Sequence, residues 1–294
     1  MARLRIFMAR VKPYFYVAPT IVLIIAVFFY PVIDLVRRSL FGTSEGAWRF
    51  LGLANYHLVF EDPIFWESLT NNLRLFLAVP LLVVVSLIVS TILFEEIRGW
   101  WFHRSVVFLP YILSIQVVGI VFTYLLGLRG VLNQILKFVG LRFLVRDWLG
   151  QPSIAIFSIM GIVIWKEVGF GIVLFLARLM SIEEELYEAA RIDGANWWQL
   201  MWHVTIPQLS TVIEFYVLVS LINMLSWMFN YIFVMTRGGP GTSTYVLDFF
   251  IYQNAFRFSQ LNIAATVSLL LLLLAGVLVL AQSIARRRLE ELEW

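Results

Sequence analysis

The stretch around which this chain is organised reads Glu188-Ala189-Ala190-Arg191-Ile192-Asp193-Gly194-Ala195. It lies in a polar interval, and no window between residues 178 and 206 is apolar enough to cross a bilayer. Apolar residues recur in this interval at helical spacing, at Ile182, Leu186 and Ala189. Because glycine readily adopts the left-handed conformation of a helix C-cap, we expect Gly194 to end this helix. The interval therefore predicts a short amphipathic helix between two apolar segments.

Capping signals surround this helix on both sides. Ser181 and Glu184 stand in the S-x-x-E spacing of a capping box, which predicts the N-terminus of the helix. Asn196 and Gln199 form a second such pair, so a second short helix is expected after the glycine turn. Pro207 is expected to open the next apolar segment, because proline is well tolerated in the first turn of a helix.

The composition of the chain is that of an integral membrane protein. Hydrophobic residues make up 61% of the 294 residues, charged residues make up only 14%, and the mean hydropathy is +0.86. A soluble domain carries nearly twice that share of charge. The net charge of +3 is small and no basic-aromatic tract accompanies it, so no nucleic-acid partner is expected.

Charge-poor intervals divide the chain into spans. About 20 apolar residues are needed to cross the hydrocarbon core as a helix, and alternating ten-residue strands typical of a barrel are absent from the sequence. The prediction is a single all-α transmembrane domain over residues 1–294 with the polar loop at about 178–206. Its six helices are expected at about 14–34, 72–94, 105–128, 152–177, 207–236 and 258–285.

The polar loop resembles the EAA loop of ABC importer permeases, whose pattern is E-A-A, three residues, G, nine residues and I-x-L-P. Here Glu188-Ala189-Ala190 is followed at the matching spacing by Gly194 and by Val204, Ile206 and Pro207, with Val and Ile in place of Ile and Leu. The resemblance implies a cytoplasmic coupling helix between helices 4 and 5 that docks on an ATP-binding subunit. It assigns this coupling role to Glu188, Ala189, Ala190, Asp193, Gly194 and Pro207.

A second motif narrows the resemblance. Thr236-x-Gly238-Gly239-Pro240 follows the fifth predicted span, and together with the opening from Pro13-Tyr14 to Ser39-Leu40 it is similar to the sugar-permease branch. Within that branch the chain resembles the first permease of maltose-transporter-type pairs. That likeness implies a loop at Gly238, Gly239 and Pro240 that faces an extracytoplasmic sugar-binding protein.

The same resemblance implies the partners of the chain. These are a second permease in a heterodimer, two ATP-binding subunits, the sugar-binding protein and the lipid bilayer. ATP and magnesium are expected on the ATP-binding subunits, with no cofactor in this chain.

The distribution of basic residues predicts the orientation in the membrane. The two ends of the chain carry Arg3, Arg5, Arg10 and Lys12 before the first span and Arg286-Arg287-Arg288 after the last. The positive-inside rule then places both termini of this multi-pass protein in the cytoplasm. The resemblance implies that the membrane is the plasma (inner) membrane of a bacterial or archaeal cell. The first apolar segment is long for the core of a signal peptide and lacks a cleavage site, so it is expected to be retained.

Polar side chains at the middle of three spans are candidates for a substrate pathway. Polar residues are costly inside a membrane and commonly face a cavity. Lys166 and Glu167 point about 100° apart on a helix, so we expect only one of the two to line a given cavity. An alternative is that the amides join helices and that Trp227 only packs. The candidates are Gln116, Lys166, Glu167, Ser220, Asn223 and Trp227.

Enzymatic and metal-binding functions are not expected. The chain has no cysteine, and its three histidines (His57, His103 and His203) lie far apart, so neither a catalytic site nor a metal site is predicted. The G-x-x-x-x-G-K-[ST], H-E-x-x-H and G-x-S-x-G motifs do not occur in the sequence. Two alternatives remain open, which are an importer permease for glycerol phosphate or polyols and, more distantly, a secondary transporter.

Overall fold

The computed structural model describes residues 14, 16–44, 47–94 and 99–292. The basic residues 3–12 and Pro13 used in the sequence analysis lie outside this part of the chain. Six described helices are long and apolar enough to cross a membrane, and the predicted all-α, six-helix membrane fold is confirmed. These candidate spans are Tyr16–Leu40, Pro63–Phe94, Ile115–Phe138, Pro152–Leu179, Trp197–Ser226 and Leu261–Ile284.

The chain divides into two compact units. The first comprises residues 1–62 and 251–273, and the second comprises residues 63–250 and 274–294. The first unit contains a two-stranded antiparallel hairpin in which Phe41 pairs with Phe50. Its elements are η1 (Ile25–Phe29), α2 (Tyr30–Leu40), β1 (Phe41–Ser44), β2 (Ala47–Phe50), α3 (Ala54–Glu61) and η4 (Gln253–Arg257).

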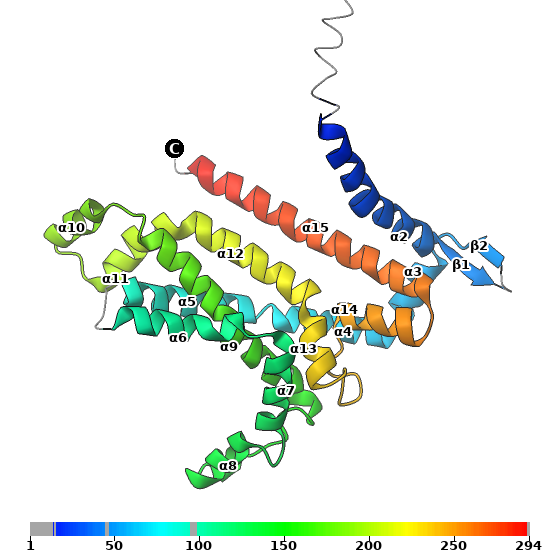
Figure 1. Cartoon of the computed structure of the whole chain (residues 1–294), viewed down its shortest axis with the longest axis horizontal. Coiled ribbons are helices and arrows are strands. Elements are labelled where there is room, and N and C mark those ends of the chain that lie inside the picture. The colour runs from blue at the N-terminus through cyan, green and yellow to red at the C-terminus, as the bar shows by residue number, and fades with distance from the viewer. Residues whose placement is uncertain (1–13, 15, 45–46, 95–98, 293–294) are drawn as a thin grey trace, which may run out of the picture. The chain divides into compact units, whose positions relative to one another are not determined.

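The second unit contains the polar loop and the middle spans (Figure 1). Two helices, α14 (Leu247–Tyr252) and α15 (Leu261–Leu292), contribute residues to both units. The remaining elements are α4 (Pro63–Leu75), α5 (Ala78–Phe94), α6 (Trp100–Ile112), α7 (Ile115–Leu126), α8 (Val131–Phe138), η2 (Arg142–Leu144), α9 (Pro152–Leu179), α10 (Glu184–Ile192), α11 (Trp197–Leu200), η3 (Met201–Thr205), α12 (Ile206–Ser226) and α13 (Met228–Met235).

Helix α9 lies at the centre of the second unit and packs against α5, α6 and α12. A Cβ atom on Gly171 would lie 2.4 Å from the Ser86 hydroxyl and 2.5 Å from the Tyr216 ring, so glycine allows three helices to approach closely there. Ser86 also donates a hydrogen bond of 3.2 Å to the Val168 carbonyl. Small and hydroxyl side chains of this kind are common where membrane helices meet.

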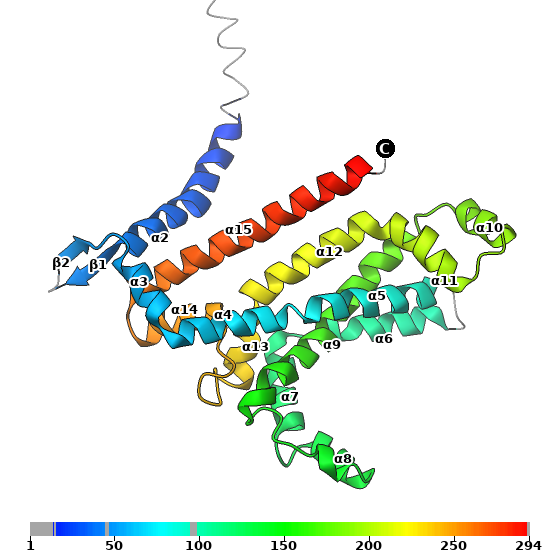
Figure 2. The same cartoon turned by 180° about the vertical axis from the view of Figure 1, so that it is seen from behind.

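Two predicted spans are broken, which corrects the expectation of continuous helices over residues 105–128 and 207–236. Helix α6 ends before Leu113 and Ser114, which adopt extended backbone conformations. Pro110 lies in the last turn of α6 and has no N–H to donate, which weakens the helix at that point. The second break is at Trp227, where α12 ends and α13 begins in a different direction (Figures 1 and 2).

The helix caps observed in the polar loop agree only in part with those predicted from the sequence. Gly194 has a φ of +82° and follows α10, as expected. Asn196 and Gln199 form the predicted capping box of α11, and Pro207 lies in the first turn of α12. The Ser181 prediction is wrong, because α10 has Glu183 as its N-cap and the Ser181 hydroxyl donates instead to the Arg178 carbonyl, at 2.7 Å.

Candidate functional site

A cavity of about 440 Å³ lies beside the two helix breaks. Cavities of 300–1,000 Å³ with a few polar groups are typical of small-molecule sites. Side chains from α6, α7, α9, α12 and α13 surround it, so both halves of each broken helix contribute. The lining residues are Tyr111, Ile115, Val163, Lys166, Glu167, Phe170, Val219, Asn223, Met224, Trp227, Met228 and Tyr231.

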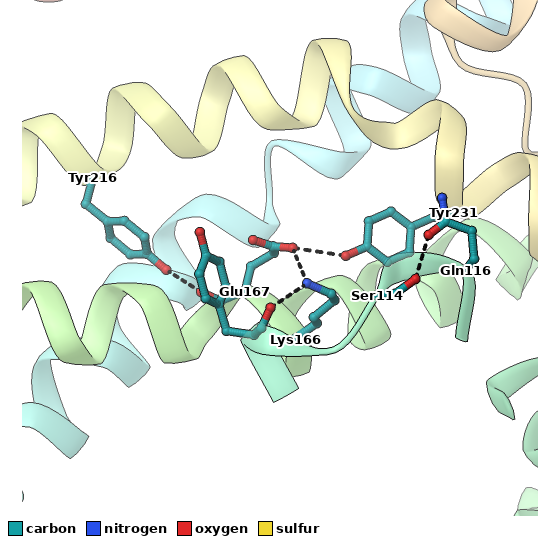
Figure 3. Close-up of polar contacts among 7 residues, drawn as sticks. Ser114, Gln116, Lys166, Glu167, Tyr216 and Tyr231 are labelled. Atoms are coloured by element: carbon teal, nitrogen blue, oxygen red, sulfur yellow. Dashed lines mark hydrogen bonds and ion pairs between the residues drawn. The ribbon is translucent and has the colours of Figure 1, made fainter. Parts of the chain in front are cut away.

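Lys166 is committed to neighbouring protein groups. Its side chain is 5% exposed, and its Nζ atom lies 3.5 Å from Glu167 Oε1. The same atom donates a hydrogen bond of 3.0 Å to the Tyr111 carbonyl, in the last turn of α6, and lies 5.2 Å from the centre of the Tyr111 ring. Carbonyls at a helix C-terminus lack partners within the helix. Lys166 therefore stabilises the end of α6 and also forms an ion pair with Glu167 (Figure 3).

Glu167 joins three helices at the cavity. Its Oε1 atom accepts a hydrogen bond of 3.0 Å from the Tyr231 hydroxyl on α13, and its backbone carbonyl accepts one of 3.3 Å from the Tyr216 hydroxyl on α12 (Figure 3). Its side chain is 20% exposed, against 5% for Lys166. The carboxylate is thus the more accessible of the two charges, and it can accept further hydrogen bonds from a molecule in the cavity.

The structure brings four of the six candidate residues to this cavity. Lys166, Glu167, Asn223 and Trp227 line it. The expectation that Lys166 and Glu167 would not share one cavity is wrong, because the long lysine side chain extends to the side of the helix that bears Glu167.

Two candidates lie elsewhere, and eight of the twelve lining residues were not predicted. Gln116 lies in the first turn of α7, where it accepts a hydrogen bond of 2.7 Å from Ser114, and Ser220 is buried among helices. Neither is among the residues that line the cavity. The aromatic residues Tyr111 and Tyr231 do line it. The signal that could have identified Tyr111 is the preceding Pro110, which marks the helix break.

The polar loop forms a second candidate site. Glu188 and Asp193 are exposed on α10 and at its end, whereas Tyr187 is buried. The Tyr187 hydroxyl lies 3.3 Å from the Thr205 hydroxyl, and its ring lies 5.8 Å from that of Phe94 at the end of α5. These contacts connect α10 to the ends of two membrane helices.

Two hollows flank α10. One of about 540 Å³ lies on the side of Tyr187 and reaches Phe94 and Met201. The other, of about 310 Å³, adjoins the glycine turn and includes Ala190, Asp193, Gly194 and His203. Of the predicted coupling residues, Ala190, Asp193 and Gly194 thus share one hollow. Glu188 and Ala189 are exposed without lining either hollow.

The Gly-Gly-Pro loop is tightly folded. Gly238 has a φ of +87°, and a Cβ atom there would lie 2.5 Å from the Tyr245 ring and 2.7 Å from the Phe249 ring. The Thr244 hydroxyl donates a hydrogen bond of 2.8 Å to the Gly239 carbonyl. Position 238 therefore requires glycine for both its conformation and its lack of a side chain. Within the described residues, no group of three or more acidic or histidine side chains is placed to hold a metal ion.

Comparison with known protein families shows which family this chain belongs to. The family described as "Binding-protein-dependent transport system inner membrane component" matches residues 63–290. The chain is a member of this family. The resemblance noted in the sequence is thereby confirmed, and the six apolar helices are those of a multi-pass inner membrane permease.

Relatives of this permease cover almost its whole length. It is 33% identical to the lactose transport system permease protein LacF of Rhizobium radiobacter over 94% of both chains. It is 31% identical to the sulfoquinovosyl glycerol transport system permease protein SmoG of Agrobacterium fabrum, over 88% of this chain and 84% of that one.

The permease is also similar to a solved structure. A chain in the crystal structure of a bacterial ABC transporter involved in the import of the acidic polysaccharide alginate is 26% identical to it, with a TM-score of 0.82 over 97% of this chain and 99% of that one. A chain in a second crystal structure, that of a bacterial alginate ABC transporter in complex with an alginate pentasaccharide-bound periplasmic protein, is likewise 26% identical with a TM-score of 0.82. The relatives are transport permeases, and the family's description says that its transport systems depend on a binding protein.

Proposed function

We propose that this permease is one of two membrane subunits of an ATP-driven ABC importer for sugars or oligosaccharides. The observation that carries the proposal is the cavity beside the two helix breaks, with its carboxylate, amide, hydroxyl and indole groups. Glu167 and Asn223 can bind sugar hydroxyls, and the exposed ring of Trp227 offers a surface for the apolar face of a pyranose ring. The carbohydrate names of its relatives support the same substrate class.

The charges of the cavity favour a neutral sugar over a phosphorylated substrate. Among the residues that line the cavity, Lys166 is the cation, and it is already engaged by Glu167 and by the Tyr111 carbonyl. A phosphate group would have to displace Glu167 from this pair. The glycerol-phosphate importer weighed in the sequence analysis is therefore disfavoured, whereas a polyol would meet the same hydroxyl-binding groups as a sugar.

The polar loop is proposed to be the coupling helix. Its exposed face at Glu188 and Asp193 would bind one of two ATP-binding subunits, and Gly194 would allow the turn that places this face. ATP and magnesium would be held by those subunits, and the permease itself would catalyse no reaction. A second, different permease would complete the membrane pair. Both termini and α10 would then lie in the cytoplasm, and residues 236–242 would face the binding protein outside.

Reconstitution tests the proposal. The permease is co-expressed with a candidate second permease and a candidate ATPase from the same genome, and the complex is placed in liposomes with a candidate binding protein. We expect uptake of labelled sugar that requires ATP and the binding protein. Glu167→Gln and Trp227→Ala should lower uptake at least tenfold with the complex intact, whereas Phe157→Ala, on an exposed part of α9 away from the cavity, serves as the control. Uptake without the ATPase subunits would favour a secondary transporter and contradict the proposal.

A further inference from the structure

The break between α12 and α13 is held on both sides by side chains from other elements. On the α12 side, the Met224 carbonyl accepts a hydrogen bond of 2.7 Å from Asn72 Nδ2 on α4. On the α13 side, the Phe229 N–H donates a hydrogen bond of 2.5 Å to Asp248 Oδ2. Broken helices leave unpaired carbonyls before the break and unpaired N–H groups after it. Asn72 and Asp248 each satisfy one of these groups.

Both side chains also bind the start of α14. Asn72 Oδ1 accepts a hydrogen bond of 2.9 Å from the Leu247 N–H, and Asp248 Oδ1 accepts one of 2.8 Å from the Phe249 N–H. Asn72 is fully buried and uses its amide in both directions. The residues that begin α14 are therefore connected to both sides of the helix break.

The preceding loop is fixed to the same place. Asn71 Nδ2 donates hydrogen bonds of 2.9 Å each to the Ser243 and Tyr245 carbonyls. The Thr236 and Thr244 hydroxyls lie 2.8 Å apart and close the loop from within. These bonds attach the loop from residue 236 to residue 246 to α4, the helix that also binds the start of α14 through Asn72. A displacement of the loop would therefore move Leu247 and Asp248 with it.

Four residues at the break line the cavity, namely Asn223, Met224, Trp227 and Met228. Trp227 is the residue between the two helices, and Asn223 lies one turn before it on α12. A change in the angle between α12 and α13 would alter the positions of both side chains. Mechanical coupling between two sites requires an element with alternative arrangements, and a change of angle at this break would supply one.

We propose that Asn72 and Asp248 are positioning residues that transmit displacement of the 236–246 loop to the helix break at Trp227 and thereby set the shape of the cavity. The proposal rests on the proposed function, because it assumes that the binding protein docks on this loop. It goes beyond that function by naming the side chains through which docking outside the membrane reaches the substrate cavity. Neither residue lines the cavity itself.

The test uses the absence of cysteine from the chain. Ser226 is exposed at the end of α12, so Ser226→Cys introduces a nearly isosteric reporter beside the break. Its rate of labelling by N-ethylmaleimide is measured in the purified complex, alone and with the binding protein of the reconstituted system plus ATP. The background is varied with Asn72→Ala, Asp248→Ala and Asp248→Asn. The matched control is Asp147→Ala, because Asp147 likewise accepts a hydrogen bond from a backbone N–H, that of Gly150 at 2.9 Å.

Two results are expected. Asp248→Ala and Asn72→Ala should change the labelling rate of the complex alone by about tenfold or more, the factor expected when one hydrogen bond to a buried or charged group is lost. They should also abolish the response to the binding protein and the stimulation of ATPase, while basal ATPase and copurification are retained. Asp248→Asn keeps a carbonyl oxygen for Phe229 and should preserve part of the response, and Asp147→Ala should behave as the parent.

The outcomes separate this proposal from the proposed function. Unchanged labelling of the complex alone in both alanine variants would overturn it, even if the permease imports sugar. Altered labelling with a normal response to the binding protein would also overturn it, because Asn72 and Asp248 would then be clamps without a transmitting role. If Asp248→Ala does not assemble, Asp248→Asn and Asn72→Ala decide, and a parental response in both refutes the proposal. If the complex without substitutions at Asn72 and Asp248 shows no response to the binding protein, the proposed function is contradicted instead. The labelling rate of the complex alone then still tests whether Asn72 and Asp248 hold the helix break.

Discussion

The ion pair between Lys166 and Glu167 allows the structural and transport roles of the cavity to be separated. The perturbation is Glu167→Gln, which removes the negative charge but keeps an oxygen that can accept the hydrogen bond from Tyr231. The charged atoms lie 3.5 Å apart. At an effective dielectric constant of about 20, their attraction is about 5 kcal/mol. Stranding a buried charge by removing its partner costs roughly 3–5 kcal/mol.

The two single variants are expected to differ in stability. Glu167→Gln leaves Lys166, whose side chain is 5% exposed, without its counter-charge and should destabilise the permease by about 3 kcal/mol. Lys166→Met leaves Glu167, which is 20% exposed and keeps the Tyr231 hydrogen bond, so the loss should be smaller. The double variant buries no unpaired charge and should be close to the parent in stability, since neutral replacements of buried ion pairs are often tolerated.

The assay is a double-mutant cycle on the reconstituted complex, with unfolding followed in mixed detergent micelles and sugar uptake measured in parallel. Stability should return in the double variant, whereas uptake should stay low because the cavity has lost its carboxylate. A coupling energy below about 0.5 kcal/mol, within the error expected for independent sites, would refute the reasoning. Full recovery of uptake in the double variant would show that Glu167 does not bind the substrate.

Three further predictions follow from local geometry. Gly194→Ala places a side chain at a φ of +82° and should cost about 1–2 kcal/mol, seen as weaker copurification of the ATPase, with Ala195→Gly as the control that leaves binding unchanged. Burial raises the pKa of Asp248 from 3.8 to about 7, so its stabilising contribution is complete below about pH 4 and is lost as the pH rises through 7; Asp248→Asn should remove this part of the pH dependence of unfolding. Thr242→Cys should react with a membrane-impermeant thiol reagent added outside the cell, and labelling from the cytoplasmic side alone would invert the proposed topology.

Local signals in the sequence predicted local structure well. Charge-poor intervals identified six membrane helices, since the bilayer requires long apolar segments whatever the tertiary contacts. Gly194 and the Asn196–Gln199 pair act within a few residues of themselves, and the structure forms both features. The prediction that Ser181 caps the next helix failed for a local reason, because its hydroxyl donates a hydrogen bond to the preceding Arg178 carbonyl. Serine near the end of a helix always has this alternative.

The helix breaks could not be derived from hydropathy. A window average treats residues 207–236 as one apolar segment, although α12 ends before Trp227. The groups that stabilise this break come from distant parts of the chain, with Asn72 on α4 and Asp248 on α14. The first break carried a visible signal in Pro110, but a proline in a membrane helix often causes only a kink. The cavity is built around these breaks, so its lining was predicted only in part.

The helix breaks also indicate how polar residues inside this membrane domain should be interpreted. A broken helix exposes backbone groups that lipid cannot satisfy, so each break requires polar side chains. Lys166 binds the Tyr111 carbonyl, Asn72 binds the Met224 carbonyl, and Asp248 binds the Phe229 N–H. A polar residue within a span can therefore serve the backbone rather than a substrate, and a sequence does not distinguish the two. Glu167 retains an accessible carboxylate after its protein contacts are made, and by this criterion it is the stronger ligand candidate of the adjacent pair.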